Sequence, residues 1–378
     1  MFGLAYYFII LTCSCLALML LQRDTVVMLG KPNLRCFSKR HFLLFVFAVS
    51  PIVLTYMLRY GIGTDYFSYK RIFETLHGAS IPEYIAKHKV NNEVYYVEPG
   101  YFVLNRFCCI SYVSLNLVCS VLMFFFIYYG TVRCLPKADI TLSVLIYFCT
   151  QFIYSMNGMR FAIAVTIVFF GFRFILAKQL LKWILTIVVA VSFHKTSLMC
   201  IPLYFLCNIE NKKLSKIRNT AWYLFVFAFP IIAKFFIQIV SQMSIFSRYF
   251  AVAQYALGVF TFKPMFLFHI VPVILPLLIL KKQFLFNDYK ASVLFRLYLF
   301  EVPLRELGSF NTWLTRLTRF PQIVQVIFVP YVLSSIKNSK MRKLLTVYYV
   351  MLYAFFFIYG AVVNDAGDSL PYRSILFI

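Results

Sequence analysis

Four arginines stand at or near the ends of long apolar segments of this sequence: Arg59, Arg160, Arg316 and Arg319. A guanidinium is planar, always charged and able to bond two oxygen atoms of one anion. Arginines that meet on one face of a protein therefore favour an anionic ligand. The alternative is that each side chain extends along the membrane surface to a phospholipid headgroup. The first interpretation is favoured if all four lie on the side of the membrane where basic residues are scarce.

Two carboxylates and one histidine could transfer protons beside these arginines. Asp65 and Glu98 follow Arg59 in the sequence, and His194 precedes Lys195. Carboxylate and imidazole groups are common general bases in proteins. A lone histidine is more often a hydrogen-bonded core residue, but the charged Lys195 beside it disfavours a dry, purely structural environment. We therefore treat Asp65, Glu98 and His194 as candidate proton acceptors.

The composition excludes soluble and disordered proteins. Of the 378 residues, 62% are hydrophobic and only 13% are charged, whereas a soluble domain has about 25% charged residues. A soluble chain of this length would form two or three domains, and the polar residues are too few to cover their surfaces. So much apolar surface must also be buried, which a disordered chain cannot do. The chain is therefore expected to cross a membrane many times.

The net charge and the cysteine content argue against a nucleic-acid-binding protein and against a cysteine-based metal site. The net charge of +24 comes from 37 Lys and Arg against 13 Asp and Glu. No basic stripe lies on a soluble segment, so the charge indicates basic cytoplasmic loops and no nucleic-acid partner. The ten cysteines show no CxxC and no Cys/His metal spacing. They are interpreted as small core residues, and neither a metal site nor a cofactor is expected.

Twelve apolar segments have the length of membrane-spanning helices, for which about 20 residues are needed. They cover residues 3–21, 41–58, 100–130, 139–156, 160–177, 181–193, 195–209, 219–240, 264–280, 291–307, 319–336 and 344–362. The segment 100–130 is a long or broken span. The prediction is an all-α, polytopic membrane protein with about 12 transmembrane helices. They form a single transmembrane domain, residues 1–378, with an outward-facing cavity.

Basic residues set the orientation of these spans. The alternate loops that follow residues 21, 130, 177, 209, 280 and 336, with the adjoining helix ends, contain 22 of the 37 Lys and Arg residues. Cytoplasmic loops carry the excess of basic residues, so these six loops are predicted to be cytoplasmic and both termini to lie outside. The four arginines then all fall on the outer face. This favours their convergence on an anion over contacts with lipid headgroups.

The longest outer segment runs from Arg59 to Glu98. Its apolar residues recur at helical spacing opposite a polar face: Tyr66, Tyr69, Phe73 and Leu76. Asp65 is placed to cap the start of this helix. We predict an outer loop at residues 59–98 whose amphipathic helix lies on the membrane surface. A second short helix is predicted to begin at Ser80, where the sequence fits a capping box.

Two polar groups lie at a depth where an isolated charge is unfavourable. His194 comes 12 residues after the nearest cytoplasmic lysine, a rise of about 18 Å against a hydrocarbon core of about 30 Å. The hairpin tip at Ser192–Thr196 is therefore predicted to lie below the outer surface, buried in protein or lining a water-filled cavity. Glu301 and Arg305 are spaced to pair on one helix face, and Pro303 between them is expected to kink or break that helix. A structural ion pair and a role in the site are equally supported.

Five short segments, spread along most of the chain, form a combined pattern. They are Arg59–Tyr66 followed by Tyr69, Glu98–Tyr101 followed by Asn105, Asn157–Ala162, Phe193–Leu198 and, more loosely, Arg319–Phe320 with Pro371–Tyr372. Together they resemble the EpsG family of polysaccharide polymerases, Wzy-type proteins that assemble bacterial O-antigens, capsules and exopolysaccharides. Residues 240–318 show no match, so the resemblance does not support a role for Arg305 or Arg316.

The resemblance implies glycosyl transfer on the periplasmic side of the bacterial inner membrane. Such proteins take a growing glycan from its undecaprenyl-pyrophosphate carrier and join it to the next lipid-linked repeat unit. The implied partners are the undecaprenyl-pyrophosphate-linked oligosaccharide donor and acceptor and membrane lipid, with a chain-length regulator left open. The four arginines would bind the pyrophosphate, which needs no metal. Asp65, Glu98 or His194 would act as base, and Tyr66 and Tyr69 would stack on sugars.

Two alternatives remain open. An O-antigen ligase-like transferase moves finished glycan onto a lipid A core, but such proteins usually have one outer loop much longer than the 40 residues found here. A transporter or flippase of lipid-linked glycans places charges near the membrane midplane between internal repeats. No repeat relates the two halves of this sequence, and only Glu301 and Arg305 favour transport.

Overall fold

The computed structural model describes residues 3–29, 39–89, 96–134, 139–207, 265–308 and 315–377, with isolated positions between 220 and 242. By their contacts these residues form two compact units, Met1–Ile201 with Leu333–Ile378, and Pro202–Val332. Each unit is described by itself. The single transmembrane domain over 1–378 stays a prediction.

The described backbone is helical and contains no strand, which confirms the all-α prediction. Five of the described helices are long and apolar enough to cross a membrane: Leu4–Gln22, Tyr112–Cys134, Ile140–Asn157, Met159–Leu176 and Ser339–Val363. The pair His41–Ala48 and Ser50–Leu58, bent by 58°, makes a sixth. The chain is therefore a multi-pass membrane protein. Twelve spans and an outward-facing cavity stay predictions.

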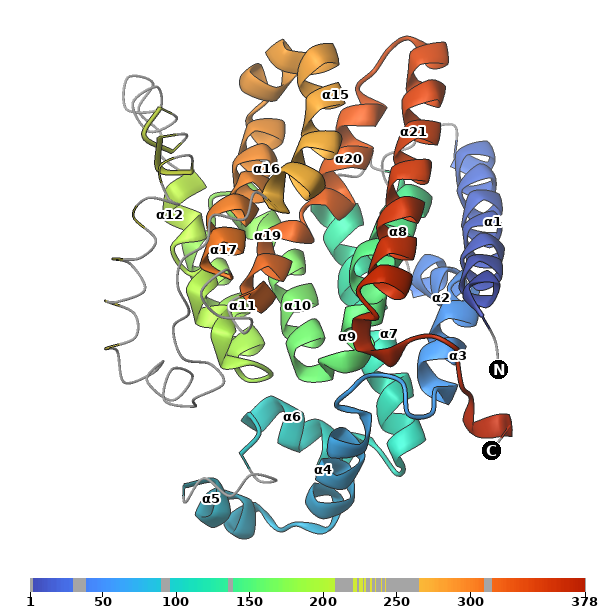
Figure 1. Cartoon of the computed structure of the whole chain (residues 1–378), viewed down its shortest axis with the longest axis vertical. Coiled ribbons are helices and arrows are strands. Elements are labelled where there is room, and N and C mark those ends of the chain that lie inside the picture. The colour runs from blue at the N-terminus through green and yellow to red at the C-terminus, as the bar shows by residue number, and fades with distance from the viewer. Residues whose placement is uncertain are drawn as a thin grey trace. The chain divides into compact units, whose positions relative to one another are not determined.

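All five long helices and the bent pair lie in the first unit (Figure 1). Its helices are α1 (Leu4–Leu29), α2 (Lys39–Ala48), α3 (Ser50–Leu58), α4 (Tyr66–Gly78), α5 (Ile81–Lys89), α6 (Pro99–Val103), α7 (Tyr112–Cys134), α8 (Ile140–Tyr147), α9 (Ile153–Asn157), α10 (Met159–Leu176), α11 (Leu180–Val191) and α21 (Ser339–Ile358). Short π-helical turns follow α6, α8 and α21, namely η1 (Leu104–Cys108), η2 (Phe148–Phe152) and η6 (Tyr359–Val363). Three 3₁₀ turns complete the unit: η3 (Lys195–Cys200), η7 (Ala366–Asp368) and η8 (Ile375–Phe377).

The second unit is also helical. Its described elements are α12 (Leu203–Cys207), α15 (Met265–Asn287), α16 (Tyr289–Leu299), α17 (Glu301–Leu307), η5 (Arg316–Thr318), α19 (Arg319–Gln322) and most of α20 (Gln325–Ser334). Most of the span predicted at 219–240 lies outside the described residues.

In three of the interrupted predicted spans, a proline accounts for the break. Proline has no N–H to donate, and its ring clashes with the carbonyl four residues earlier. Pro51 lies at the start of α3, at the bend after α2. Pro202 separates η3 from α12 in the sequence, so the continuous helix predicted at 195–209 is wrong. Pro303 follows Leu299, the last residue of α16, by four positions, and α17 begins at Glu301.

Two more predicted spans differ in length. The long span at 100–130 is broken, because α6 and η1 end at Cys108 and α7 begins at Tyr112. The helix predicted at 181–193 is α11, which has 12 residues and ends at Val191. The chain then turns at Ser192, at the predicted position.

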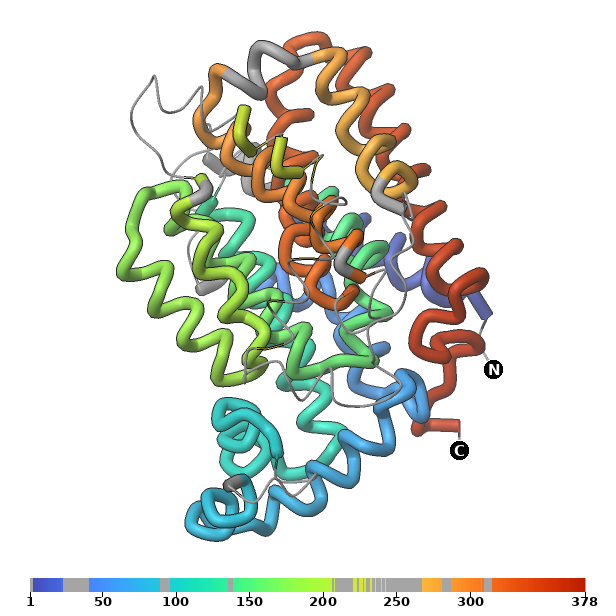
Figure 2. Tube along the Cα trace, turned by 60° about the vertical axis from the view of Figure 1, so that its left-hand side comes forward, coloured from blue at the N-terminus to red at the C-terminus, as the bar shows by residue number. Residues whose placement is uncertain are grey.

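The outer loop forms two helices, as predicted. The apolar stripe of α4 is buried: Tyr66, Tyr69, Phe73 and Leu76. It packs on protein, with the Tyr66 ring edge-on to Tyr112 and Tyr69 edge-on to Tyr101. At the start of α5 the backbone N–H of Glu83 donates to Ser80 Oγ at 3.2 Å. Figures 1 and 2 both place α4, α5 and α6 together, beyond the ends of α3 and α9. Contact of this loop with the membrane surface stays a prediction.

Residues 367–373 hold the turn at residues 59–65, which we call the first outer turn after its predicted side of the membrane. The backbone N–H of Tyr60 donates to the carbonyl of Arg373 at 2.9 Å, and that of Gly63 donates to the carbonyl of Gly367 at 2.7 Å. Nη2 of Arg373 donates to the carbonyl of Gly61 at 3.2 Å. These bonds join residues that are about 300 positions apart in the sequence. The segment 359–377 is thus an integral part of the first unit.

Small residues let the central helices of this unit approach closely. α7 packs on α10 and α10 on α11 (Figure 2). A Cβ at Gly130 of α7 would lie 2.5 Å from the ring of Phe169 on α10. A Cβ at Gly171 of α10 would lie 2.7 Å from a methyl of Thr186 on α11. Helices in membranes pack through such small residues, because apolar burial does not drive them together in lipid.

Replacing Gly130 with valine is expected to destabilise the first unit. The new side chain must displace the Phe169 ring, and overpacking of this kind costs about 1–3 kcal/mol. The measurement is the thermal unfolding midpoint of purified protein in detergent. Gly360→Val is the matched control, because a Cβ at Gly360 meets nothing within 4 Å. Equal midpoints for the two variants would contradict the close α7–α10 packing.

Candidate functional site

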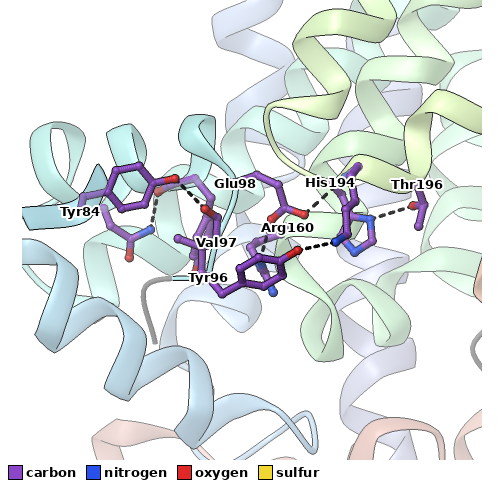
Figure 3. A network of polar contacts seen from close by, with 10 residues as sticks. Tyr84, Tyr96, Val97, Glu98, Arg160, His194 and Thr196 are labelled. Atoms are coloured by element: carbon purple, nitrogen blue, oxygen red, sulfur yellow. Dashed lines mark hydrogen bonds and ion pairs between the residues drawn. The ribbon is translucent and has the colours of Figure 1, made fainter. Parts of the chain in front are cut away.

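An ion pair between Glu98 and Arg160 lies at the centre of the candidate site (Figure 3). Glu98 immediately precedes α6, and Arg160 is the second residue of α10. Nη1 of Arg160 donates to Oε2 of Glu98 at 2.6 Å, and their side chains are only 21% and 15% exposed. Buried charges require such a partner, since an unpaired charge removed from water costs several kcal/mol. The pair therefore fixes α6 against α10.

The turn after α11 packs on the segment Tyr96–Gly100, which we call the strap. The backbone N–H of Lys195 donates to Oε1 of Glu98 at 3.4 Å, and Nζ of Lys195 donates to the Tyr96 hydroxyl at 2.8 Å. The backbone N–H of Gly100 donates to the carbonyl of Ser192 at 2.7 Å. These bonds attach the turn to the strap, and residues 192–196 are half-buried. The depth of the turn in the membrane stays a prediction. The strap brings Glu98 to both the turn and Arg160.

His194 lies in this turn with a defined ring orientation. Its Nδ1 is 2.7 Å from Oγ1 of Thr196, and the Phe161 ring contacts it edge-on (Figure 3). The side chain is half-buried. The structure thus brings two candidate proton acceptors, Glu98 and His194, to the same turn.

Two tyrosine rings border the guanidinium of Arg160. The Cζ atom lies 5.9 Å from the ring centre of Tyr69 on α4 and 5.8 Å from that of Tyr101 on α6. The negative face of an aromatic ring attracts a cation at such distances. Both rings are nearly fully buried. Three helices therefore contribute to the position of Arg160.

Tyr84 supports the strap from α5. Its hydroxyl donates to the carbonyl of Val97 at 2.7 Å, and its ring stacks on Phe102 at 4.0 Å (Figure 3). Burial and, to a smaller extent, the negative charge of Glu98 raise the pKa of Tyr84 to about 12. The phenol therefore keeps its proton at neutral pH and continues to donate to the strap.

Asp65 lies directly before α4, at the predicted capping position, but its side chain makes no capping bond. The turn that carries it is held by Asn157, the last residue of α9. Oδ1 of Asn157 accepts from the Thr64 hydroxyl at 2.7 Å and from the backbone N–H of Asp65 at 3.1 Å. Tyr66 follows, with its ring buried and its carbonyl accepting from the Tyr112 hydroxyl. Tyr66 is thus a packing residue of this turn.

Arg59 differs from the expectation of an arginine open to the outer face. Its side chain is fully buried, with the guanidinium 4.0 Å from the ring centre of Tyr56. Nη2 donates to Oδ1 of Asn116 at 3.2 Å and to Sδ of Met159 at 3.1 Å. The turn after α3 and the start of α7 enclose it. Arg59 joins α3 to α7 and α10 in the core of the first unit.

The remaining predicted residues belong to the second unit. Arg319 donates from Nη1 to Oε1 of Gln322 at 2.7 Å, and Arg316 is exposed. Arg305 pairs with the fully buried Glu301, which confirms the predicted pair. The convergence of Arg316 and Arg319 on Arg160 stays a prediction.

Two residues of the site had no role assigned from the sequence. Asn157 and Gly100 both lie in the segments that formed the combined pattern. A Cβ at Gly100 would lie 2.5 Å from Oγ and 2.7 Å from the carbonyl oxygen of Ser192. Glycine has no side chain, so Gly100, which follows Pro99, was a sequence signal that another backbone segment approaches closely there. Within the described ranges, no group of three His, Cys, Asp or Glu residues is arranged to hold a metal ion.

The model of the EpsG family matches residues 42–374, a range that includes every candidate site residue. No curated protein and no solved structure matches the chain.

Replacing Gly100 with alanine is expected to separate the strap from the turn. The new methyl group would collide with the Ser192 carbonyl, which is backbone and cannot rotate away, and the resulting strain costs about 1–3 kcal/mol. The thermal unfolding midpoint should fall relative to the unchanged protein. Gly78→Ala on α4 is the control, because a Cβ there meets nothing within 4 Å. A Gly100→Ala protein as stable as the control would show that the strap does not need this contact.

Proposed function

The chain belongs to the EpsG family, the family of Wzy-type polysaccharide polymerases, and on that premise we propose what it does. It joins undecaprenyl-pyrophosphate-linked oligosaccharide repeat units into O-antigen or exopolysaccharide. The reaction is a glycosyl transfer on the periplasmic side of a bacterial inner membrane. The observation that carries the proposal is the cluster of Glu98, Arg160 and Lys195, in which three separate family-like segments meet.

Arg160 is proposed to bind the pyrophosphate of the lipid carrier. Only its Nη1 is engaged by Glu98, and its buried Nε has no hydrogen-bond partner among the described residues. A guanidinium has five N–H donors, so it can hold one carboxylate and still bond phosphate oxygens. Fixed positive charge stabilises the departing pyrophosphate as the glycosidic bond forms. Arg316 and Arg319 are proposed to add to this binding.

The other site residues receive roles that follow from their surroundings. Tyr66 and Tyr69 are too deeply buried for sugar stacking, and we assign them to positioning the outer turn and the Arg160 guanidinium. Arg59, enclosed beside Tyr56, is assigned to holding α3 against α7. Asp65, Glu98 and His194 remain the candidates for the base that activates the acceptor hydroxyl.

The proposed partners are the lipid-linked glycan donor and acceptor and the surrounding lipid, with neither a cofactor nor a divalent metal. An O-antigen ligase-like transferase and a flippase would use the same carrier. Incubation of the purified protein with lipid-linked repeat units separates these activities. A polymerase yields a ladder of longer glycans, a ligase requires a lipid A core, and a flippase forms no new bond.

Arg160→Lys and Arg160→Ala are both expected to weaken polymerisation strongly. Lysine keeps the charge but cannot hold Glu98 and a phosphate oxygen with one planar group. Loss of a charge-assisted hydrogen bond worth about 1.5–3 kcal/mol slows transfer by about ten- to 150-fold. The measurement is the rate of ladder formation at equal membrane levels.

Arg106→Lys is the matched control, because Arg106 donates from Nε to the carbonyl of Ala79 in the same outer loop and binds no carboxylate there. It should leave the ladder close to normal. A near-normal ladder from Arg160→Lys would indicate that Arg160 does not bind the pyrophosphate.

The periplasmic location gives a prediction about topology. Reporter fusions after Lys89 and after Lys213, which lies outside the described residues, should show opposite sidedness. The reason is that 22 of the 37 basic residues fall in the six loops predicted to be cytoplasmic. Paired periplasmic and cytoplasmic reporters read the two positions directly. The same sidedness at both positions would contradict the twelve-span map.

A further inference from the structure

Asp65 and Glu98 have opposite surroundings. Glu98 has both oxygens engaged, Oε2 by Arg160 at 2.6 Å and Oε1 by the backbone N–H of Lys195 at 3.4 Å. The carboxylate of Asp65 makes no hydrogen bond and no ion pair with the residues that the structure describes. A carboxylate whose two oxygens already accept hydrogen bonds has fewer acceptor sites left for a substrate hydroxyl. An unengaged carboxylate keeps all of them.

Most other carboxylates of the first unit are engaged elsewhere. Glu83 and Asp368 pair with neighbouring basic side chains, and Asp139 accepts from the first N–H groups of α8. Asp365 resembles Asp65 in making no side-chain bond to the described residues, but it is exposed and no described contact joins it to Arg160. Among the carboxylates that the structure describes in the first unit, Asp65 alone combines an unengaged carboxylate with a half-buried position beside the candidate site.

The turn that carries Asp65 is built to a defined shape. Gly61 and Gly63 have φ of +62° and +94°, which other residues rarely adopt. A Cβ at Gly63 would lie 2.6 Å from the carbonyl oxygen of Met156, so the turn lies directly on α9. Asn157 then fixes the backbone N–H of Asp65 at 3.1 Å. The position of the Asp65 carboxylate is thus determined by its backbone, without any bond to the carboxylate itself.

The same contacts place this turn beside Arg160. Asn157, which holds Asp65, precedes Arg160 by three residues at the junction of α9 and α10. The backbone N–H of Tyr69, one turn along α4, donates to the Asp65 carbonyl at 2.9 Å, and the Tyr69 ring borders the Arg160 guanidinium at 5.9 Å. Two separate links therefore connect Asp65 to the arginine that is proposed to bind pyrophosphate.

We propose that Asp65 is the catalytic base of the transfer and that Glu98 is a positioning residue that holds Arg160 and the turn at Lys195. The assignment rests on the proposed polymerase function and deepens it. It distinguishes two carboxylates of similar chemistry by what each already binds.

The proposed transfer moves one proton, forms one bond and breaks one bond. The acceptor sugar hydroxyl gives its proton to the Asp65 carboxylate, which becomes a carboxylic acid. The hydroxyl oxygen forms a bond to the anomeric carbon of the donor glycan. The bond from that carbon to the carrier phosphate breaks, and its electron pair leaves with the undecaprenyl pyrophosphate. Arg160 binds the additional negative charge, and Asp65 later releases its proton to water.

The test compares amide variants of the two carboxylates in the full-length protein. Asp65→Asn should slow ladder formation from lipid-linked repeat units by about 10²- to 10⁴-fold, the usual contribution of a general base. Asp65→Glu keeps a carboxylate and should retain part of the activity. Glu98→Gln can still accept from Arg160 and should lose only about tenfold, the cost of one weakened charge-assisted hydrogen bond.

Binding of undecaprenyl pyrophosphate separates positioning from proton transfer. Asp65→Asn should bind this probe as tightly as the unchanged protein, with the same thermal midpoint, because no bond of the Asp65 side chain is lost. Glu98→Gln should bind it about tenfold more weakly, since Arg160 then has a neutral partner that positions it less firmly. Glu74→Gln on α4 and Asp365→Asn are the matched controls, and both should leave binding and rate unchanged.

Several results would overturn the assignment. These are a normal ladder from Asp65→Asn, a larger loss from Glu98→Gln or His194→Gln than from Asp65→Asn, or a loss from Asp365→Asn that equals it. Weakened probe binding by Asp65→Asn would show that Asp65 contributes to binding instead. An unchanged protein that binds the probe but forms no ladder would refute the polymerase function itself, and the assignment with it.

Discussion

The ion pair between Glu98 and Arg160 is the interaction on which the arrangement of the strap, α6 and the turn after α11 depends. It joins α6 to α10, and the second oxygen of the same carboxylate accepts from the turn after α11. In a chain with 37 basic and 13 acidic residues, such a carboxylate is scarce. Removing either partner would leave the other charge largely buried and unpaired, which is strongly unfavourable. The tyrosines around Arg160 and the strap against the turn are arranged about this one contact.

Cations in this unit are stabilised in two different ways. Arg160 has a carboxylate partner, whereas the fully buried Arg59 lies against neutral groups, among them the Tyr56 ring, the Asn116 amide oxygen and the Met159 sulfur. Polarisable and neutral groups replace an anion there, at a higher cost of removing the charge from water. The first arrangement leaves donors for a ligand, and the second fastens three helices together. Residue type alone does not distinguish these two uses of arginine.

Much of the fold follows from the sequence because its causes are local. Apolar length predicts the long helices, helical spacing predicts the buried stripe of α4, and Ser80 predicts the start of α5. The interruptions at Pro51, Pro202 and Pro303 were only partly foreseen, because a proline within a long apolar run is compatible with either a kink or a break. Apolar length therefore predicts that these helices exist better than it predicts where each of them ends.

The candidate site was predictable in its members but not in its contacts. Glu98, Arg160 and His194 were identified by type and by pattern, and chain turns bring them together. Glu98 binds Arg160, whereas the Asp65 carboxylate has no bond to the described residues, and this difference depends on contacts between segments about 60 to 100 positions apart. No local signal encodes such pairings. The burial of Arg59 likewise results from the packing of α7 and the C-terminal segment around it.

The bonds between the first outer turn and residues 367–373 have a consequence for biosynthesis. The ribosome makes Gly61 and Gly63 about 300 residues before their partners Gly367 and Arg373, a delay of about 15 to 60 seconds at about 5 to 20 residues per second. During that interval the helices on either side of the turn can insert and pack, while the turn itself lacks the bonds that define its shape. The turn therefore reaches its final shape only after residue 373 has been made. A nascent chain that stalls before residue 367 would hold packed helices joined by a turn that is still without these bonds.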